Sequence, residues 1–254
     1  YIAPVNEVEE FIRIETPEEL TVLDPACGSG HMLTYAFDLL YSIYEEEGYQ
    51  PSQIPTHILE NNLHGLEIDE RAGALAAFAL TMKARAKQRR FFSTIAAPRI
   101  LVLKNVEFSA YELAQVSILQ GRNSLLEALA NMDQIGSLYR PDSSDKAILN
   151  VLASKIETEG NILSEALKEK LEAAITICET LDKRFEVVVA NPPYMGSSNM
   201  NAWLSGWLKN NYPDEKSDLF SAFVTRNAYF GKQYAQIGMM IPFVWMFISS
   251  YEKL

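Results

Sequence analysis

Cysteine and histidine are scarce in this chain of 254 residues, which holds two of the first and three of the second. Cys27 and Cys178 lie far apart in the sequence, and neither has a metal-ligating neighbour at a useful spacing. This pattern argues against a disulfide scaffold and a cysteine-rich zinc site, and it predicts a cytoplasmic protein. The histidines, His31, His57 and His64, form no metal-binding or catalytic-triad pattern, so we expect structural roles for them.

Long apolar runs are also missing. No stretch approaches the ~20 residues that a bilayer-spanning helix needs, and no basic-then-apolar signal peptide opens the chain. We therefore expect no association with a membrane. The composition, 48% hydrophobic and 22% charged, is ordinary for a globular protein and is compatible with one large domain that carries an insertion.

Basic residues are fewer than acidic ones, 22 against 33, which gives a formal net charge of −11. A surface that grips nucleic acid throughout is not expected, since phosphate binding needs clustered lysine and arginine. One run departs from this balance, at residues 83–90 (Lys-Ala-Arg-Ala-Lys-Gln-Arg-Arg). Two interpretations stay open for it: the solvated C-terminal end of a helix, where cations favour the dipole, or a patch that contacts a nucleic-acid backbone.

Five short apolar runs predict the strands of a sheet. They are rich in leucine or β-branched residues and continuous rather than alternating, as in strands covered on both faces. Helical patterns separate most of them. Strands that alternate with helices predict an α/β fold with a mostly parallel, doubly wound sheet and right-handed crossovers. The runs are residues 20–23, 63–68, 99–103, Phe185–Ala190 and 236–241.

Two segments interrupt this alternation. Residues 45–57 predict a polar, proline-containing loop before the second strand. About 80 residues separate the third and fourth runs, far more than one crossover helix needs. We predict a mostly helical insertion at residues 111–181, with a loop at residues 140–145.

The most informative stretch, Asn191-Pro192-Pro193-Tyr194, follows the fourth run. A polar amide, two rigid prolines and an aromatic ring contribute little to a core at the end of a buried strand. The Asn191 side chain and the Pro192 main-chain carbonyl are hydrogen-bond acceptors, and Tyr194 has a flat face for stacking. Two acceptors beside a stacking face suit a planar ring with an exocyclic NH2 group, such as adenine.

A glycine-containing loop, residues 24–30 (Asp-Pro-Ala-Cys-Gly-Ser-Gly), follows the first run. Glycine permits close approach of a ligand, and the next helix N-terminus supplies unpaired N–H groups. Alone, the loop also fits a plain strand-to-helix turn, because the P-loop lysine and the third dinucleotide glycine are missing. After the second run, Glu67 can accept hydrogen bonds from a ribose diol, and Asp69 can serve as a helix cap. Three such loops at one sheet edge predict a ligand site.

Residues 24–30 together with Asn191-Pro192-Pro193-Tyr194 resemble the S-adenosylmethionine-dependent DNA adenine-N6 methyltransferases of the gamma class, a highly specific pairing. A wider match resembles the large methyltransferases of BREX phage-defence systems. It rests on residues 199–201, 216–220, 245–247 and 249–254 (Asn-Met-Asn, Lys-Ser-Asp-Leu-Phe, Trp-Met-Phe and Ser-Ser-Tyr-Glu-Lys-Leu). The resemblance covers most of the chain and is weak across residues 111–181. It implies a Rossmann-like methyltransferase fold, with residues 1–254 as an incomplete catalytic domain that lacks the target-recognition domain.

The resemblance also implies roles for single residues. Four residues of the glycine loop would line the methionine part of S-adenosylmethionine: Asp24, Ala26, Gly28 and Gly30. Glu67 would hold the ribose hydroxyls, and Ile68 would pack against the adenine of the cofactor. Asn105 either replaces the family's aspartate that binds the adenine amino group or lies in a loop without ligand contact. For the family's motif that closes over the cofactor, two alternatives stay open: residues 1–11 hold its remnant, or it has been cut away.

The implied reaction moves a methyl group to adenine N6 in DNA, with Asn191, Pro192 and Tyr194 as catalytic residues. Acceptance of both N6 hydrogens by Asn191 and Pro192 would direct the nitrogen lone pair at the methyl group. The adenine must leave the duplex to reach this socket, where Tyr194 would stack on it. The expected partners are double-stranded DNA with a flipped adenine and, from the BREX resemblance, other phage-defence subunits.

Two other functions stay open. Protein methyltransferases that modify a glutamine amide use the same Asn-Pro-Pro-Tyr socket, although residues 24–30 resemble the DNA enzymes. A cofactor-binding, DNA-surveying subunit that is inactive alone would also fit the acidic composition. Trp203 and Trp207, four residues apart, predict a packed helix face or a contact with DNA.

Overall fold

The computed structural model describes residues 11–93, 96–159 and 164–243. Three predicted features fall wholly or mainly outside these ranges: the cofactor-closing motif of residues 1–11 and the two segments at residues 245–247 and 249–254. In the part of the chain that the structure describes, no helix has the length and apolar character needed to cross a membrane.

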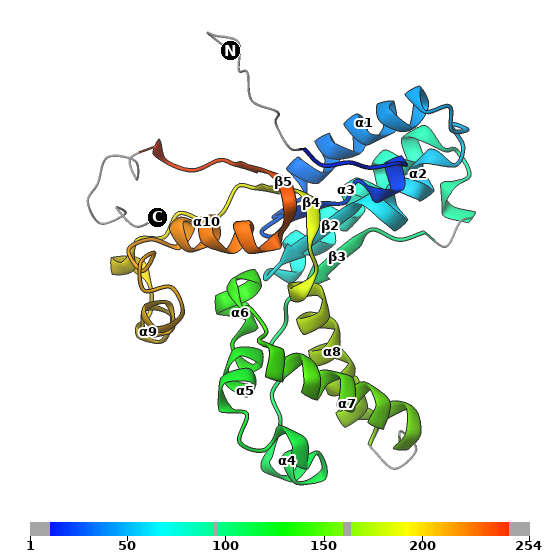
Figure 1. The fold of residues 1–254 in the computed structure, drawn as a ribbon. Helices are drawn as coiled ribbons and strands as arrows, with labels where there is room; N and C mark the ends of the chain where they lie inside the picture. The colour runs from blue at the N-terminus through cyan, green and yellow to red at the C-terminus, as the bar shows by residue number, and fades with distance from the viewer. Residues whose placement is uncertain (1–10, 94–95, 160–163, 244–254) are drawn as a thin grey trace.

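Five parallel strands form one sheet in the order β3-β2-β1-β4-β5 (Figure 1). The order reverses at β1, so the carboxyl ends of β1 and β4 bound the crevice in which open α/β sheets bind ligands. The predicted α/β, Rossmann-like fold with a parallel, doubly wound sheet is confirmed. The strands are β1 (Val22–Asp24), β2 (Leu63–Glu67), β3 (Arg99–Val102), β4 (Phe185–Ala190) and β5 (Gly231–Met239).

Strand β4 has its predicted bounds, whereas the other four strands differ. β1 begins later than predicted, because the preceding residues close a 3-10 turn (Pro17–Glu19). β2 and β3 each end one residue early. β5 begins at Gly231 rather than Gln236, because the register shifts opposite Phe185 and Val187 and brings polar residues into this edge strand. An edge strand has one free side and tolerates such irregularity.

Helices α1 (His31–Glu46) and α3 (Glu70–Lys87) cover one face of the sheet. Asp69 caps α3, because its side chain accepts hydrogen bonds from the main-chain N–H groups of Arg71 and Ala72, at 2.8 and 2.9 Å. The helix-cap interpretation of Asp69 is therefore confirmed. Apolar side chains of both helices form a first core with the sheet, which includes Val22, Leu33, Phe37, Leu63, Ala76 and Leu80.

The predicted loop at residues 45–57 is confirmed only in its middle part, residues 47–53. Helix α1 continues to Glu46, and a second helix, α2 (Ile54–His57), runs on into a π-helical turn (Ile58–Asn62). Pro55 lies in the first turn of α2, where the missing N–H group removes no intrahelical hydrogen bond. Proline in this position is compatible with the start of a helix, and only the short connection between α1 and α2 is a loop.

The basic run at residues 83–90 forms the end of α3 and the turn after it. Lys83 is paired with Asp38 of α1, and the Lys87 ammonium lies 4.1 Å from the ring centroid of Tyr41. Two of the positive charges of this run therefore interact with side chains of α1. They favour the helix-end interpretation over a patch that contacts nucleic acid.

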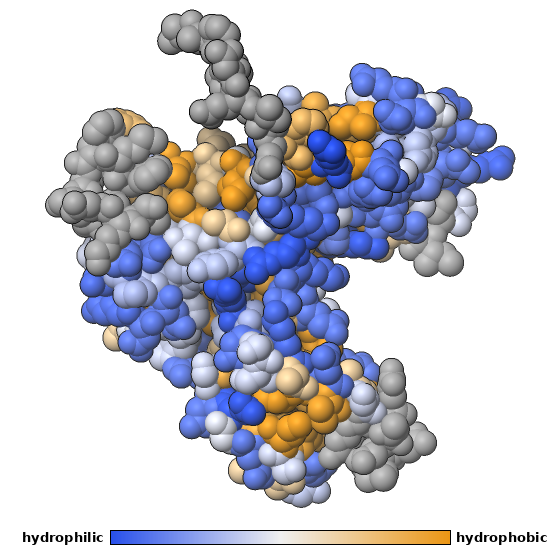
Figure 2. Space-filling model, in the orientation of Figure 1, coloured by the Kyte–Doolittle hydropathy of each residue, from blue (hydrophilic) through white to orange (hydrophobic). Residues whose placement is uncertain are grey.

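Every described element between β3 and β4 is helical, and these helices extend away from the sheet (Figure 1). Figure 2 shows them as a lobe that projects from the body of the molecule, called here the helical lobe. The lobe and α10 form a second core against the other sheet face, around Leu23, Leu66 and Val188. The predicted loop at 140–145 is shortened, because Asp142 caps α7. The helices are α4 (Ala110–Gln115), α5 (Asn123–Ala130), α6 (Met132–Ile135), α7 (Ser143–Glu159) and α8 (Glu165–Asp182), followed after β4 by α9 (Ala202–Asn211) and α10 (Leu219–Phe230).

Candidate functional site

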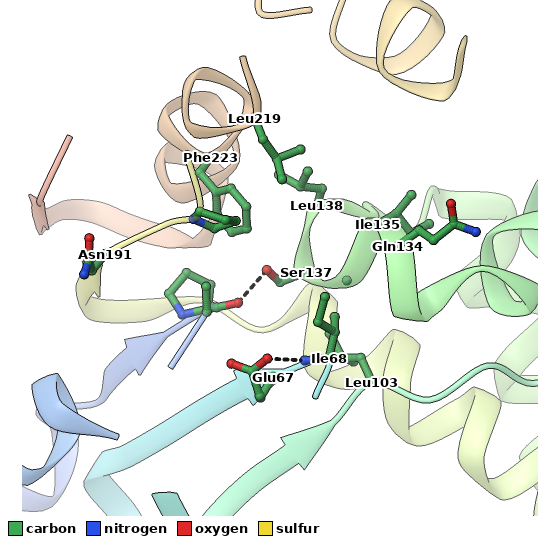
Figure 3. Close-up of a pocket in the computed structure, with 14 residues that line it drawn as sticks. Glu67, Ile68, Leu103, Gln134, Ile135, Ser137, Leu138, Asn191, Leu219 and Phe223 are labelled. Carbon is green, nitrogen blue, oxygen red and sulfur yellow. Dashed lines mark hydrogen bonds between the residues drawn. The ribbon is translucent and has the colours of Figure 1, made fainter. Parts of the chain in front are cut away.

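A cavity of about 280 Å³ lies at the carboxyl edge of the sheet, where the loops after β1, β2 and β4 meet. Figure 3 shows Glu67, Ile68 and Leu103 on its sheet side, with Leu219 and Phe223 of α10 opposite them. Most of the lining is apolar, and a few polar side chains interrupt it. A concave, mostly apolar site with a few polar groups is typical of pockets for small ligands.

The glycine loop has the backbone that its sequence predicts. Gly28 and Gly30 have positive φ angles of +53° and +84°, and Gly30 is the N-cap of α1. A Cβ atom on Gly30 would lie 3.0 Å from the Cβ of Ala76 in α3, so the loop packs too closely there for a side chain. Pro25 and Ala26 of the same loop line the cavity.

Asp24, at the end of β1, is buried, and its Oδ1 accepts a hydrogen bond of 3.2 Å from the N–H of Ala26. Burial raises the pKa of this carboxyl group to about 7, and the nearby charge of Glu67 acts in the same direction. Burial also raises the pKa of Cys27 well above its usual value, so this cysteine is a packing residue and not a thiolate nucleophile.

Glu67 ties the ends of two strands together. Its Oε2 accepts a hydrogen bond of 2.7 Å from the N–H of Gly28, and its Oε1 accepts bonds of 2.8 and 3.0 Å from the N–H groups of Ile68 and Asp69. Three main-chain donors therefore fix this carboxylate at the edge of the cavity, between the glycine loop and the end of β2.

The Asn191-Pro192-Pro193-Tyr194 loop is more exposed to solvent than Asp24. Asn191 is exposed, Pro192 is buried, and the Tyr194 side chain is 56% exposed. The Tyr194 hydroxyl donates a bond of 2.8 Å to the carbonyl of Met240, and it lies 3.4 Å from Asn191 Oδ1, a long and weak contact. Asn191 and Pro193 line the cavity, and Figure 3 places Asn191 apart from the other labelled side chains.

Asp218, of the Lys-Ser-Asp-Leu-Phe stretch, holds this loop against α10. Its Oδ1 accepts bonds from the N–H groups of Met195 and Phe220, at 3.1 and 3.3 Å, and so caps the helix and binds the loop at once. The N–H of Leu219 donates to the carbonyl of Met195 at 3.0 Å, and residues 196 and 218 form an antiparallel bridge. The loop after β4 and the first turn of α10 therefore form one unit.

Asn105 does not line this cavity. Its Oδ1 accepts a bond of 2.9 Å from the N–H of Asp133, at the start of α6. Asn105 lines a different cavity of about 480 Å³, between the β3 end and α8. The geometry thus favours the loop interpretation of Asn105, and its contact with a cofactor stays a prediction.

One wall of the cavity was not predicted from the sequence. That wall comes from the helical lobe, at the end of α6 and the 3-10 turn that follows (Gly136–Leu138). Gly136 has a φ angle of +49°, and a glycine inside an otherwise helical pattern was the one local signal of a tight turn. Leu219 and Phe223 of α10 were also missed as lining residues, because their apolar spacing resembles that of any core helix.

Trp203 and Trp207 pack against the second core. The Trp203 indole N–H donates a bond of 3.1 Å to Glu127 of α5, and the Trp207 ring lies 5.9 Å from that of Tyr212. The packed-face interpretation is therefore supported. Among the described residues, no group of three or more histidine, cysteine and acidic side chains is arranged to hold a metal ion.

Comparison with known proteins decides the family. A model of the Eco57I restriction-modification methylases matches residues 61–254, which is most of the chain. The chain belongs to this methylase family. A model of the MmeI DNA-methyltransferase domain also matches residues 13–107, which include the glycine loop and Glu67. These matches, with the adenine-specific relatives described next, confirm the predicted resemblance to DNA adenine methyltransferases.

Two curated relatives of this methylase are similar over nearly all of the chain. The adenine-specific methyltransferase BrxX of Escherichia coli O9:H4 (strain HS) is 37% identical over 271 residues, 94% of this chain and 22% of the relative. The adenine-specific methyltransferase PglX of Lacticaseibacillus casei (strain Zhang) is 34% identical over 249 residues, 93% of this chain and 21% of the relative. The chain spans about a fifth of the length of these relatives.

Proposed function

We propose that this methylase moves a methyl group from S-adenosylmethionine to adenine N6 in DNA, within a restriction-modification or BREX-type defence system. The observation that carries the proposal is the Asn191-Pro192-Pro193-Tyr194 loop at the carboxyl end of β4, in one cavity with Glu67 and the glycine loop. The names of both relatives specify adenine. Family membership makes DNA the expected substrate.

The lining of the cavity fits S-adenosylmethionine. Ile68, Leu103 and Phe223 offer apolar surface for the flat adenine ring, and the Glu67 carboxylate offers an acceptor position for a ribose hydroxyl. We assign the methionine part to the glycine loop, which permits close approach of its backbone. When bound there, the cofactor supplies an electrophilic methyl group on its sulfonium. The glycine-loop residues in this proposal are Asp24, Ala26, Gly28 and Gly30.

Glu67 is oriented before any ligand arrives. Its two oxygens already accept three main-chain hydrogen bonds, which fix the carboxylate plane. A carboxylate has about four acceptor positions, so one remains for a ribose hydroxyl. Because the group does not have to be reordered on binding, little side-chain entropy is lost when it holds the ribose.

Asn191 and Pro192 activate the target nitrogen in this proposal. The lone pair of adenine N6 is delocalised into the ring, which makes the nitrogen a poor nucleophile. If Asn191 Oδ1 and the Pro192 carbonyl accept the two N6 hydrogens, the nitrogen becomes more tetrahedral and its lone pair is directed at the methyl group. The bond from N6 to the methyl group would form as the bond from the methyl group to sulfur breaks, which would release S-adenosylhomocysteine, and the methylated nitrogen would then lose one proton to solvent. Positioning and electrostatic stabilisation provide the catalysis, so no general base has to act before the transfer.

The target adenine has to leave the duplex, because an NH2 group inside a base pair cannot reach both acceptors. The exposed Tyr194 ring stands beside Asn191 and offers a stacking surface for the extruded base. The proposed partners are therefore double-stranded DNA with a flipped adenine and, as the BREX-type relatives suggest, other defence subunits.

A transfer assay tests the proposal directly. The chain is incubated with S-adenosylmethionine labelled in its methyl group and with mixed-sequence DNA, and the digested nucleosides are identified by mass spectrometry. We expect the label in N6-methyladenine. Label on a glutamine amide of added protein, with none in DNA, would overturn the DNA assignment. Cofactor binding without transfer to any acceptor would assign the chain as a subunit that is inactive alone.

A further inference from the structure

Arg226 of α10 is a buried arginine, with 1% of its surface exposed. Its Nε donates a bond of 2.8 Å to the carbonyl of Ser137, and its Nη2 donates bonds of 3.0 and 2.6 Å to the carbonyls of Tyr139 and Leu181. The guanidinium also lies 3.7 Å from the ring centroid of Phe230. One side chain thereby joins three segments: α10, the end of α8 and the turn that forms one wall of the cavity.

The same turn is bonded to the glycine loop. The Ser137 hydroxyl donates a buried hydrogen bond of 2.6 Å to the carbonyl of Pro25, a residue 112 positions earlier in the chain. Pro25 and Ser137 both line the cavity. Ser137 therefore receives a bond from α10 on its carbonyl and makes one to the sheet edge with its hydroxyl, so it links the helical lobe to the loop that follows β1.

The wall approaches the sheet side very closely at Gly136. A Cβ atom on this residue would lie 2.8 Å from Cγ2 of Ile68, and the φ angle of +49° is also unfavourable for other residues. Gln134, two residues earlier, accepts a bond of 2.7 Å from Asn201, the residue that caps α9. The wall is thus held on three sides at once, by α10, by the glycine loop and by the start of α9.

We propose that Ser137 and Arg226 are positioning residues that fix this wall, so that the helical lobe sets the affinity of the cavity for the adenosyl part of the cofactor. The inference rests on the proposed function and assigns to the lobe a role in cofactor binding. The wall faces Ile68 and Leu103, the side chains that the proposal places against the adenine ring. Loss of either tether would let the wall move away from that ring.

A pair of hydroxyl deletions separates this role from a loss of stability. Ser137→Ala removes the bond to Pro25, and Tyr44→Phe removes a buried bond of 2.9 Å to Asn62 in the first core, across the sheet from the cavity. Both variants lose one buried hydroxyl bond, and we expect similar decreases in melting temperature. Affinities for S-adenosylhomocysteine and for 5′-methylthioadenosine, which lacks the amino-acid end, are then measured by calorimetry well below both melting temperatures.

We expect Ser137→Ala to lower the affinity for both ligands by the same factor, about fivefold. Tyr44→Phe should leave both affinities unchanged. Equal affinities for the two variants would overturn the positioning role while leaving the proposed function intact. A loss confined to S-adenosylhomocysteine would place the effect at the methionine end and also overturn it. If the unsubstituted chain bound neither ligand, the cofactor assignment itself would fail.

A measurement on the unsubstituted chain covers the case in which Ser137→Ala does not fold. Hydrogen–deuterium exchange is followed for the wall, residues 134–139, with and without S-adenosylhomocysteine. We expect the ligand to slow exchange in the wall and in the glycine loop together. Slower exchange in the glycine loop, with no change in the wall, would show that the ligand binds without the helical lobe and would overturn the inference.

Discussion

The two sides of the candidate site differ in how their polar groups are held. On the β1–β2 side, Asp24 is buried and Glu67 accepts three main-chain hydrogen bonds. On the β4 side, Asn191 is exposed, and its amide oxygen has only a long contact with the Tyr194 hydroxyl. On the β1–β2 side, internal hydrogen bonds already orient the polar groups, whereas on the β4 side the Asn191 acceptor is left open.

This difference matches the two tasks in the proposed reaction. A cofactor that binds in every cycle gains from groups that are already oriented, because less entropy is lost on binding. The acceptor for the target amine must instead stay free until the base arrives, since an internal hydrogen bond would compete with it. Substitutions on the two sides should therefore affect different measured quantities, the affinity for the cofactor on one side and the rate of transfer on the other.

The largest effect is expected at Asn191. Asn191→Ala removes an acceptor that acts on the nitrogen as its charge changes, so we expect transfer to slow by about 10²–10³-fold, or about 3–4 kcal/mol. Affinity for S-adenosylhomocysteine should not change. Single-turnover methylation and calorimetry measure the two quantities, with Asn211→Ala, an exposed asparagine at the end of α9, as the matched control. Unchanged methylation by Asn191→Ala would remove this residue from the reaction.

The opposite pattern is expected at Glu67. Glu67→Ala removes the charged acceptor for the ribose and also frees the N–H of Gly28, so affinity for S-adenosylhomocysteine should fall by about 1.5–3 kcal/mol. Transfer at saturating cofactor should fall much less. Glu70→Ala is the control. Glu70 is the first residue of α3, and its carboxylate forms a surface ion pair with Lys104. If both variants bind the cofactor equally well, Glu67 does not hold the ribose.

The protonation of Asp24 should make the stability of the folded state depend on pH. Its folded pKa of about 7 lies above the ordinary value of 3.8, so between these values the folded state holds a proton that the unfolded state has released. Stability therefore falls as pH rises through this range, by on the order of 2 kcal/mol between pH 5 and pH 8. Asp24→Asn removes this term and keeps an acceptor for the N–H of Ala26. Urea unfolding at both pH values measures the difference.

We expect Asp24→Asn to gain stability relative to the unsubstituted chain at pH 8 and to gain much less at pH 5. Asp133→Asn, at an exposed aspartate of α6, is the control for the substitution itself. Parallel pH dependences of the unsubstituted chain and Asp24→Asn would mean that Asp24 is ionised in the folded state across this range. The β1 end would then be polar and solvated, and the contrast between the two sides of the site would narrow.

The parts of the site that are local in sequence were predictable. The glycine loop, Glu67 and the Asn191-Pro192-Pro193-Tyr194 loop each follow a strand directly, and parallel strands bring their carboxyl ends to one edge. The sheet itself was predicted for the same reason, since its apolar runs are short, separate and interrupted by helices. The main differences are at the irregular β5 and at the end of the predicted loop after α1, where a register shift and a helix-starting proline prevailed over the residue pattern.

The wall from the helical lobe was not predictable in the same way. Its bonds join residues that are 112 positions apart, Ser137 and Pro25, and 89 positions apart, Arg226 and Ser137. No periodicity or spacing encodes such pairs, which form only when the lobe folds back onto the sheet edge. Asn105 shows the same limit, because its position after β3 was compatible with a ligand contact or a loop role, and its bond to the N–H of Asp133 in α6 could not be predicted from the sequence.

The smallest effect is expected at the Tyr194 hydroxyl. Tyr194→Phe loses the bond to the Met240 carbonyl, which lies in an exposed region, and keeps the ring for stacking. We therefore expect only small changes in the KM for DNA and in the rate of transfer, each equivalent to less than about 1 kcal/mol of free energy. Tyr194→Ala also loses the ring and should weaken DNA binding by about 1–3 kcal/mol. Steady-state kinetics at varied DNA concentration compares the two. Equal losses in both variants would show that the hydroxyl, as an anchor to the end of β5, matters more than the ring, and the open β4 side would then depend on internal bonds as much as the β1–β2 side does.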